Sequence, residues 1–373
     1  MTPGIGDQQQ KKSVLSTPHH TNLFLRRLLR QPISLIALIL IGLSVFTAVA
    51  GYWLAPDGSP DANRMIPEIG SKKPGFSVTL LKIRRDHTPP VPGFFRQLLS
   101  GKEDTWQFVP VASVMEKNDS LVYERIIDES ITERAAVSKT DCDQLNPTIA
   151  QTFYLGTDKF GRDILSRLII GVRVSLGVGM IAVLISLTIG IVLGSLAGYF
   201  KGWVDDLIMW FINVIWSIPT LLLVFAITLV LGKGFWQVFI AVGLTMWVNV
   251  ARLVRGQVIA VRELEYVEAT RVLGFSHTRT IFKHILPNIL GPVLVIAASN
   301  FASAIVIEAG LSFLGVGVQP PQPSWGLMIK ENYNFIITHN PMLALAPGLA
   351  IMLLVLAFNL LGNALRDALE VKG

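Results

Sequence analysis

Six apolar segments dominate this chain of 373 residues and restrict its possible folds more than any other feature. Each segment is long enough to cross the hydrocarbon core of a bilayer as a helix, in which the backbone groups bond to one another. Only 16% of the residues are charged, whereas a soluble domain carries about 25%. The sequence therefore predicts an all-α polytopic membrane protein with six transmembrane helices. These cover residues 32–54, 174–199, 207–231, 236–253, 289–313 and 342–361.

Basic residues indicate which way the first helix crosses the membrane. Arg26, Arg27 and Arg30 precede it, and short cytoplasmic segments are enriched in Lys and Arg. We therefore expect residues 1–31 to form a cytoplasmic tail, of which the polar residues 1–20 are disordered, and six crossings then place the C-terminus in the cytoplasm too. Because Tyr52 and Trp53 follow the apolar run instead of a cleavage site, we expect the first helix to be retained.

Residues 57–150 form a polar insert that this topology places on the extracytoplasmic side of the membrane. The insert holds 12 Lys and Arg and 14 Asp and Glu, and it contains Cys142, the one cysteine, which excludes an internal disulfide. Its composition is compatible with a small mixed domain that either is a solvated decoration or contacts an extracytoplasmic partner. We expect strands at 76–83 and 106–111, a strand and a short helix within 120–136, and a turn or linker at Pro89, Pro90 and Pro92.

A polar and basic stretch, residues 268–287, interrupts the apolar sequence between the fourth and fifth segments. Glu268 suits the first turn of a short helix, and Gly274 can end that helix in a left-handed conformation. A second helix then begins after Ser276 as its N-cap and runs toward Pro287. Two short helices at an angle would present a compact knob to a partner, although an ordinary amphipathic surface loop has the same general character.

The spacing of five residues in this stretch resembles the E-A-A…G…I-L-P loop of ABC importer permeases, which docks into a groove on a separate ATP-hydrolysing subunit. The resemblance implies that residues 254–288 form the coupling loop. Thr270 stands where that family has a second alanine, and it is small enough to preserve docking. The resemblance assigns coupling to Glu268, Ala269, Thr270, Gly274 and Pro287.

A second string is more specific to one branch of that family. Residues 155–167 read L-G-T-D-K-F-G-R-D-I-L-S-R, with a new amphipathic helix expected near Asp163. This string, like residues 308–326, resembles the C-type permease subunits of dipeptide, oligopeptide and nickel importers. The resemblance covers the first helix and residues 153–370 and implies a type I ABC importer permease fold over 153–373. The insert is not covered, and Asn363 stands where the family more often has an acidic residue.

By resemblance, the chain is a permease subunit of an ATP-driven importer for dipeptides and oligopeptides in the inner membrane. It would form half of the translocation pathway with a homologous second permease. Two ATP-binding subunits would carry ATP and magnesium, and an extracytoplasmic binding protein would deliver the peptide. No cofactor on this chain and no nucleic acid are implied. A permease for nickel or another small peptidic compound remains an alternative, and a secondary transporter or a membrane receptor is one from another class.

The residues themselves give no sign of an enzyme. The chain lacks the P-loop pattern, H-E-x-x-H, G-x-S-x-G and C-x-x-C, so we assign no catalytic and no metal-binding residue. Glu308 is an acid inside an apolar run, and it either serves the pathway or pairs with a neighbouring helix near the outer end. Polar residues in other spans either line the pore or join helices; they are Asn213, Asn249, Asn300 and Asn359.

Two local patterns concern helix packing. Gly190, Gly194 and Gly198 recur at four-residue steps, so they lie on one helical stripe where another helix can approach closely. Pro219 falls inside the third apolar segment, and we expect it to kink or open that helix.

Overall fold

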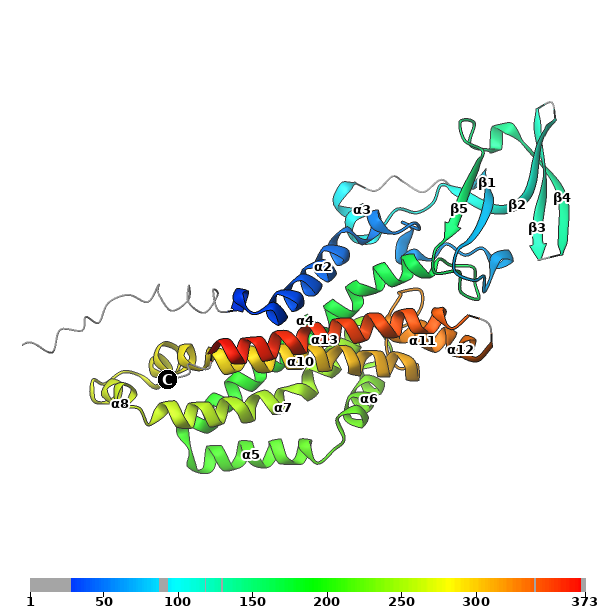
Figure 1. Cartoon of the computed structure of the whole chain (residues 1–373). Coiled ribbons are helices and arrows are strands. Elements are labelled where there is room, and N and C mark those ends of the chain that lie inside the picture. Colours follow the sequence, from blue (N-terminus) through cyan, green and yellow to red (C-terminus); the bar gives the residue numbers. More distant parts are fainter. Residues whose placement is uncertain (1–27, 87–92, 118, 129, 339, 370–373) are drawn as a thin grey trace, which may run out of the picture.

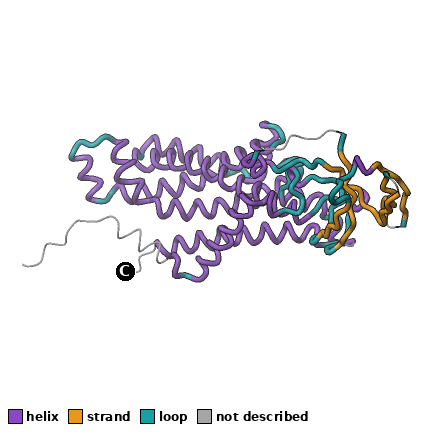
Figure 2. Tube along the Cα trace, turned by 90° about the horizontal axis from the view of Figure 1, so that it is seen from above, coloured by secondary structure: helices purple, strands orange, loops and turns teal. Residues whose placement is uncertain are grey.

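The computed structural model describes residues 28–86, 93–117, 119–128, 130–338 and 340–369. Long helices form a bundle with a small β-sheet at one end (Figure 1), and the strands are confined to that end in the perpendicular view (Figure 2). Within the described residues, five helices are long and apolar enough to cross a membrane, or six crossings result if one bent pair is a single span. The five are α2 (Pro32–Leu54), α4 (Ile164–Phe200), α7 (Phe235–Arg262), α10 (Leu286–Leu314) and α13 (Met342–Leu369).

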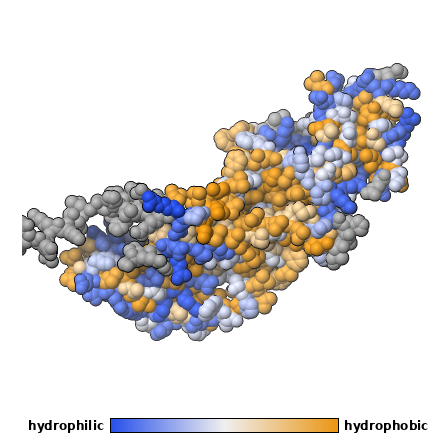
Figure 3. All heavy atoms as spheres, viewed as in Figure 1, coloured by the Kyte–Doolittle hydropathy of each residue, from blue (hydrophilic) through white to orange (hydrophobic). Residues whose placement is uncertain are grey.

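The surface follows this division of the chain. Apolar residues cover the middle of the helical bundle, and hydrophilic residues gather over the sheet and over the opposite end (Figure 3). The predicted tail lies outside the described residues up to position 27, and so do the three prolines of the predicted linker.

Several helices are longer than predicted. α4 begins at Ile164, so the helix start expected near Asp163 is confirmed, and the helix continues without a break into the second predicted span. The Asp163 side chain caps it by accepting a hydrogen bond from the Ser166 amide at 3.0 Å. α7 continues to Arg262 and α13 to Leu369, beyond the predicted ends at 253 and 361. The added turns pack against other parts of the protein: Val258 of α7 belongs to a buried cluster with Val267, and Ala364 and Ala368 of α13 pack with Leu28.

The third predicted span is two helices, α5 (Gly202–Trp216) and α6 (Thr220–Leu231), bent by 90° at the break between them. Pro219 lies in that break, where it lacks the amide hydrogen that a continuous helix needs. The predicted kink is confirmed, and it is a sharp corner.

α4 and α7 make the most extensive helix contact in the described bundle, and the glycine stripe lies along it. A Cβ atom on Gly194 would lie 2.5 Å from the Ala251 carbonyl oxygen, and one on Gly198 would lie 2.7 Å from that of Arg255. Gly190 faces Val250 at a similar distance. The predicted packing seam is therefore confirmed, and α7 is its partner.

The second helix of the polar stretch does not end at Pro287, contrary to the prediction. α9 (His277–Thr280) continues through a π-helical turn, Ile281–Ile285, directly into α10. In this wide turn the Leu286 amide donates to the Ile281 carbonyl, five residues back. The wider turn lets the chain remain helical, because the proline ring no longer meets a tight preceding turn.

The insert contains a five-stranded antiparallel sheet with strand order β4-β3-β2-β1-β5. Two predicted strands are confirmed as β1 and β2, but the short helix predicted within 120–136 is wrong. There β3 and β4 form a hairpin, because cross-strand pairing such as Leu121 with Val137 buries alternate side chains. β5 extends past residue 150. The strands are β1 (Phe76–Arg84), β2 (Trp106–Lys117), β3 (Ser120–Asp128), β4 (Ile131–Ser138) and β5 (Thr148–Phe153).

Buried charges hold the turn that connects the insert to the bundle. Arg162 is 1% exposed, and it donates to Asp158 at 2.6 Å and to Glu331 at 2.9 Å. Arg167 is fully buried, 3.8 Å from the same Glu331 carboxylate. Glu331 belongs to the short helix α11 (Trp325–Asn332), so one acid joins α11 to the turn before α4 and to the first turn of α4.

Two acids beside this junction, Asp61 and Asp163, have raised pKa values. Burial raises the pKa of Asp61 and of Asp163 above the ordinary value of 3.8. The folded chain therefore binds a proton at each site more tightly than the unfolded chain does. This contribution to stability is present at low pH and is lost as the pH rises through the raised pKa.

We predict that Gly194→Ala lowers the stability of the protein by about 1–3 kcal/mol, because its methyl group meets the backbone of α7. The matched control is Gly256→Ala on α7, where an added Cβ meets nothing within 4 Å. That variant should be neutral or more stable by up to about 1 kcal/mol. Unfolding by SDS titration in mixed micelles measures both, and equal effects would contradict the seam.

We further predict that Glu331→Gln destabilises the protein by about 3 kcal/mol, since two buried guanidinium groups lose a shared counter-charge. Glu263→Gln provides the control, because its ion pair with Lys201 is exposed and the same titration should detect no change. An equally small effect at Glu331 would show that the junction does not depend on this charge.

Candidate functional site

The polar stretch forms a compact knob between α7 and α10, made of α8 (Glu265–Val272) and α9. Gly274 ends α8 with a φ of +74°, in the left-handed region that glycine adopts most readily. The Phe275 amide donates to the Thr270 carbonyl and the Gly274 amide to the Arg271 carbonyl, both at 3.0 Å. This pair of bonds is a Schellman motif, which satisfies the last carbonyls of the helix and turns the chain toward α9.

The five residues predicted for coupling occupy different positions in and beside the knob. Glu268, Ala269 and Gly274 are exposed on it. Pro287 is also exposed, but it belongs to the first turn of α10. Thr270 is buried, so it cannot itself contact a docked partner.

Thr270 instead joins the two helices of the knob. Its hydroxyl donates to the Val267 carbonyl at 2.7 Å and shares a hydrogen bond of 3.2 Å with the fully buried Thr280. Sequence reasoning missed Thr280, although its place one turn after the Ser276 cap puts it on the inner side of α9.

The knob rests on the end of α4. The Tyr199 hydroxyl shares a hydrogen bond of 2.9 Å with His277 Nδ1. The Arg271 guanidinium lies 5.3 Å from the centroid of the Tyr199 ring, and that of Arg262 lies at 5.8 Å. The sequence analysis also missed Tyr199. Its position directly after Gly198, the last glycine of the stripe, could have identified it.

The outer surface of the knob is apolar, and basic residues surround it. Val272 is 88% exposed and Leu273 70%, an unusual exposure for aliphatic side chains at the tip of a helix. The basic residues Arg271, Arg279 and Lys283 are exposed nearby. Such a surface can enter an apolar groove with an acidic rim on another protein.

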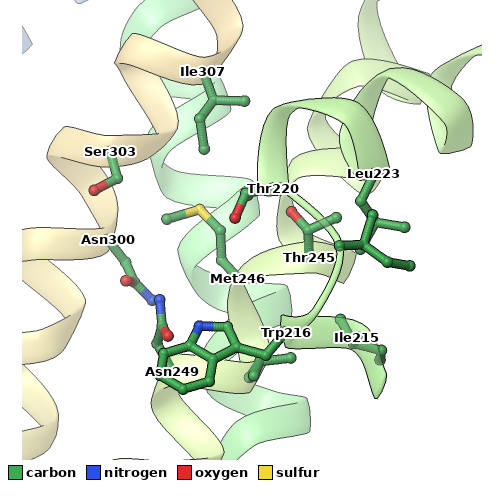
Figure 4. A pocket seen from close by; sticks show the side chains of 12 residues that line it. Ile215, Trp216, Thr220, Leu223, Thr245, Met246, Asn249, Asn300, Ser303 and Ile307 are labelled. Carbon is green, nitrogen blue, oxygen red and sulfur yellow. The ribbon is translucent and has the colours of Figure 1, made fainter. Parts of the chain in front are cut away.

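A second feature is a polar cavity of about 230 Å³ inside the bundle. It lies where the α5–α6 corner faces α7 and α10 (Figure 4). Uncharged hydrogen-bonding side chains from three helices line it, among them Thr220, Thr245, Asn249, Asn300 and Ser303. A cavity lined in this way can hold a neutral polar molecule or a peptide backbone.

Asn300 is the most distinctive of these residues. It is 3% exposed, and its Nδ2 has no hydrogen-bond partner in the described part of the chain. In Figure 4 its side chain points toward Asn249 and the open space. An unsatisfied buried amide is costly, so its position at the cavity wall suggests a ligand or water as its partner.

Three of the predicted pathway residues, Glu308, Asn213 and Asn359, do not line the cavity. Glu308 is fully buried two turns farther along α10, and its Oε1 accepts a hydrogen bond from Ser312 at 2.6 Å. Asn213 is exposed on α5 and accepts a hydrogen bond from Arg252 at 3.2 Å. Glu308 thus bonds within its own helix, and Asn213 joins α5 to α7.

Trp216 lines the cavity, and Arg252 contacts the Trp216 ring. The guanidinium carbon of Arg252 lies 3.6 Å from the centroid of the Trp216 ring, a close cation–π contact. Figure 4 shows the indole beneath Asn249. Among the described residues, no group of His, Cys, Asp and Glu is arranged to hold a metal ion.

Both described ends of the chain lie at the knob end of the bundle. Leu28 packs against Ala364 and Ala368 near the end of α13. A Cβ on Gly291, just after the start of α10, would meet Leu369. The insert occupies the opposite end (Figure 1).

Comparison with known proteins relates this architecture to a family. The family described as "Binding-protein-dependent transport system inner membrane component" matches residues 190–372. The chain is 42% identical, over 232 residues, to the glutathione transport system permease protein GsiD of Pectobacterium atrosepticum, covering 62% of this chain and 77% of that protein. It is 43% identical, over 219 residues, to the dipeptide transport system permease protein DppC of Alkalihalophilus pseudofirmus, covering 59% and 72%.

The chain is also 40% identical over 219 residues to the oligopeptide transport system permease protein OppC of Bacillus subtilis, covering 59% of this chain and 72% of that protein. Among solved structures, an inward-facing MetNI methionine ABC transporter is similar over 55% of this chain and 97% of that chain. Its TM-score is 0.46 and its identity 18%.

Proposed function

We propose that this chain, which belongs to the family of binding-protein-dependent transport system inner membrane components, forms half of the translocation pathway of an ATP-driven importer for dipeptides and oligopeptides. The single observation that carries the mechanism is the knob, an exposed apolar tip on a rigidly held helical turn. Relatives named for dipeptide, oligopeptide and glutathione transport support a peptidic substrate.

Docking of the knob would couple this chain to ATP hydrolysis elsewhere. We assign ATP and magnesium to two partner subunits and no cofactor to this chain. Val272 and Leu273 would enter a groove on one of those subunits, while Glu268, Ala269 and Gly274 lie on the same knob. Movement of the groove would then shift α8 and α9, and through Tyr199 and α10 it would move the spans as rigid bodies.

The cavity is our candidate for the part of the pathway that this chain contributes. A homologous second permease would complete it, and an extracytoplasmic binding protein would deliver peptide at the insert end. Neutral amide and hydroxyl groups can replace water around a peptide backbone without trapping it as a fixed charge would. Trp216 and Arg252 would close the cavity on the knob side.

This assignment also orients the chain in the membrane. The coupling partner hydrolyses cytoplasmic ATP, so the knob and both chain ends face the cytoplasm, and the insert is extracytoplasmic. The α5–α6 pair then counts as one span, which gives six crossings and the type I permease fold expected for residues 153–373. The arginine-rich end of α7 on the knob side follows the positive-inside tendency.

The decisive experiment is to purify the complex from native membranes through a tag on this chain and to measure its ATP hydrolysis. The assay is run with and without short peptides and the extracytoplasmic fraction. Hydrolysis that rises when both are present supports a peptide importer, whereas stimulation by nickel alone would favour the alternative substrate. Failure of any ATPase to co-purify in mild detergent would contradict the importer assignment.

We predict that Gly274→Val uncouples ATP hydrolysis from uptake while the protein still inserts in the membrane. Nothing lies within 4 Å of a Cβ at this position, so the effect comes from the left-handed backbone, which costs a non-glycine residue about 1–2 kcal/mol. Gly274→Asn is the matched control, because Asn tolerates this conformation better and should retain more coupling. Equal, normal uptake by both variants would contradict a coupling role for the knob.

We also predict that Asn300→Leu reduces peptide uptake at least tenfold without lowering thermal stability, because its buried amide has no intramolecular partner to lose. Asn359→Leu, an exposed position on α13 outside the cavity lining, should leave uptake unchanged. Transport of labelled peptide into proteoliposomes containing the whole complex provides the measurement. Normal uptake by Asn300→Leu would place the pathway elsewhere.

A further inference from the structure

The short helix α3 (Phe94–Ser100) of the insert has no buried residue, although it is rich in large apolar side chains. Phe94 is 62% exposed, Phe95 76% and Leu99 71%. Three such residues within seven positions make an unusually apolar surface for a segment outside the bundle core. A helix that faced only water would not need these three apolar side chains.

The position of α3 is fixed by the end of α2. Arg173 of α4 donates to the carbonyls of Leu98 and Leu99, both at 2.8 Å, and also to the carbonyls of Ala48 and Val49 in α2. One guanidinium therefore joins three helices. The α3 surface is held beside the last turns of α2 (Figure 1).

The exposed surface of α3 continues the exposed stripe of α2. Phe46, Val49 and Trp53 follow one another on one face of α2, and each is about half exposed. Because α2 is an apolar span with little of its surface buried inside the protein, this stripe faces lipid. The Trp53 ring then contacts the Phe94 ring, with centroids 5.3 Å apart, so the apolar surface passes from α2 to α3 without interruption.

We propose that α3 lies in the interface of the bilayer leaflet on the insert side, with Phe94, Phe95 and Leu99 among the lipid chains. A Trp at the end of a span marks the interfacial level, where amphipathic aromatic rings are enriched. The exposed residues Arg96 and Lys102 can reach lipid phosphates from this level. The membrane thereby holds the insert at a second point beyond the buried charge junction.

This anchor is independent of the importer assignment, because it depends only on α2 being a span. It lies outside residues 190–372, the part of the chain that the family match covers. An extracytoplasmic protein could also cover an apolar surface, but continuity with the lipid-facing stripe of α2 favours lipid.

The test places an environment-sensitive NBD label on the full chain in lipid nanodiscs. Phe95→Cys carries the label at the proposed lipid contact, and Leu99→Cys gives a second position on the same surface. Leu145→Cys is the control, since Leu145 is 89% exposed on the insert and far from α2 in sequence. The native Cys142 is only 3% exposed, so its background is subtracted with identically treated unmodified chain.

Lipids that carry a nitroxide near the headgroup should quench labels 95 and 99 at least threefold more than label 145. Equal quenching at all three positions would overturn the proposal. Labels 95 and 99 that are shielded from water but not quenched by nitroxide lipid would also overturn it, because a protein would then cover α3.

Discussion

The close approach of α4 and α7 is the contact on which the rest of the bundle depends. The glycine stripe lets the two backbones come within a distance that any side chain would prevent, and dispersion contacts along that length replace the hydrophobic driving force that lipid does not supply. α7 leads directly into the knob, and α4 begins at the insert junction. The seam therefore fixes the relative positions of both functional ends.

α4 acts as a strut between those ends. Its 37 residues run without a break from the cap at Asp163 to Phe200. Near one end Arg167 and Arg173 hold α11, α2 and α3, and near the other Tyr199 supports the knob through His277. A displacement of the knob thus acts on a continuous helix. This helix can transmit movement from the knob to the insert junction. The α5–α6 corner is different, because its sharp bend leaves space for the polar cavity.

The arginines on the insert side are partly or fully buried, so their charges do not indicate the membrane orientation as the charges of exposed loops do. In the proposed orientation, Arg162, Arg167 and Arg173 oppose the positive-inside tendency when they are counted as loop charges. In the fold, two of them share the Glu331 carboxylate and the third is satisfied by backbone carbonyls. They belong to the packed interior of a junction, so they give little information on orientation.

Local sequence was sufficient for features whose cause is local. The apolar lengths identified the long helices, Pro219 identified the corner, and Gly274 and Ser276 identified the end of one knob helix and the start of the next. Alternating residues identified β1 and β2, but the same reasoning failed within 120–136, where a hairpin partner decides between strand and helix. The prediction that a helix ends at Pro287 failed because a π-helical turn before this residue accommodates the proline ring.

The sequence by itself determined the apolar helices and the knob, because backbone propensity, hydrophobic length and the conformational freedom of glycine act over a few neighbouring residues. Only the tertiary structure decided which polar residues meet. It brought Asn300 and Asn249 to one cavity, left Glu308 and Asn213 outside it, buried Thr270 against Thr280, and revealed the support from Tyr199. These pairings join residues from separate helices, whose rotation and depth are set by packing and are not encoded in any one segment.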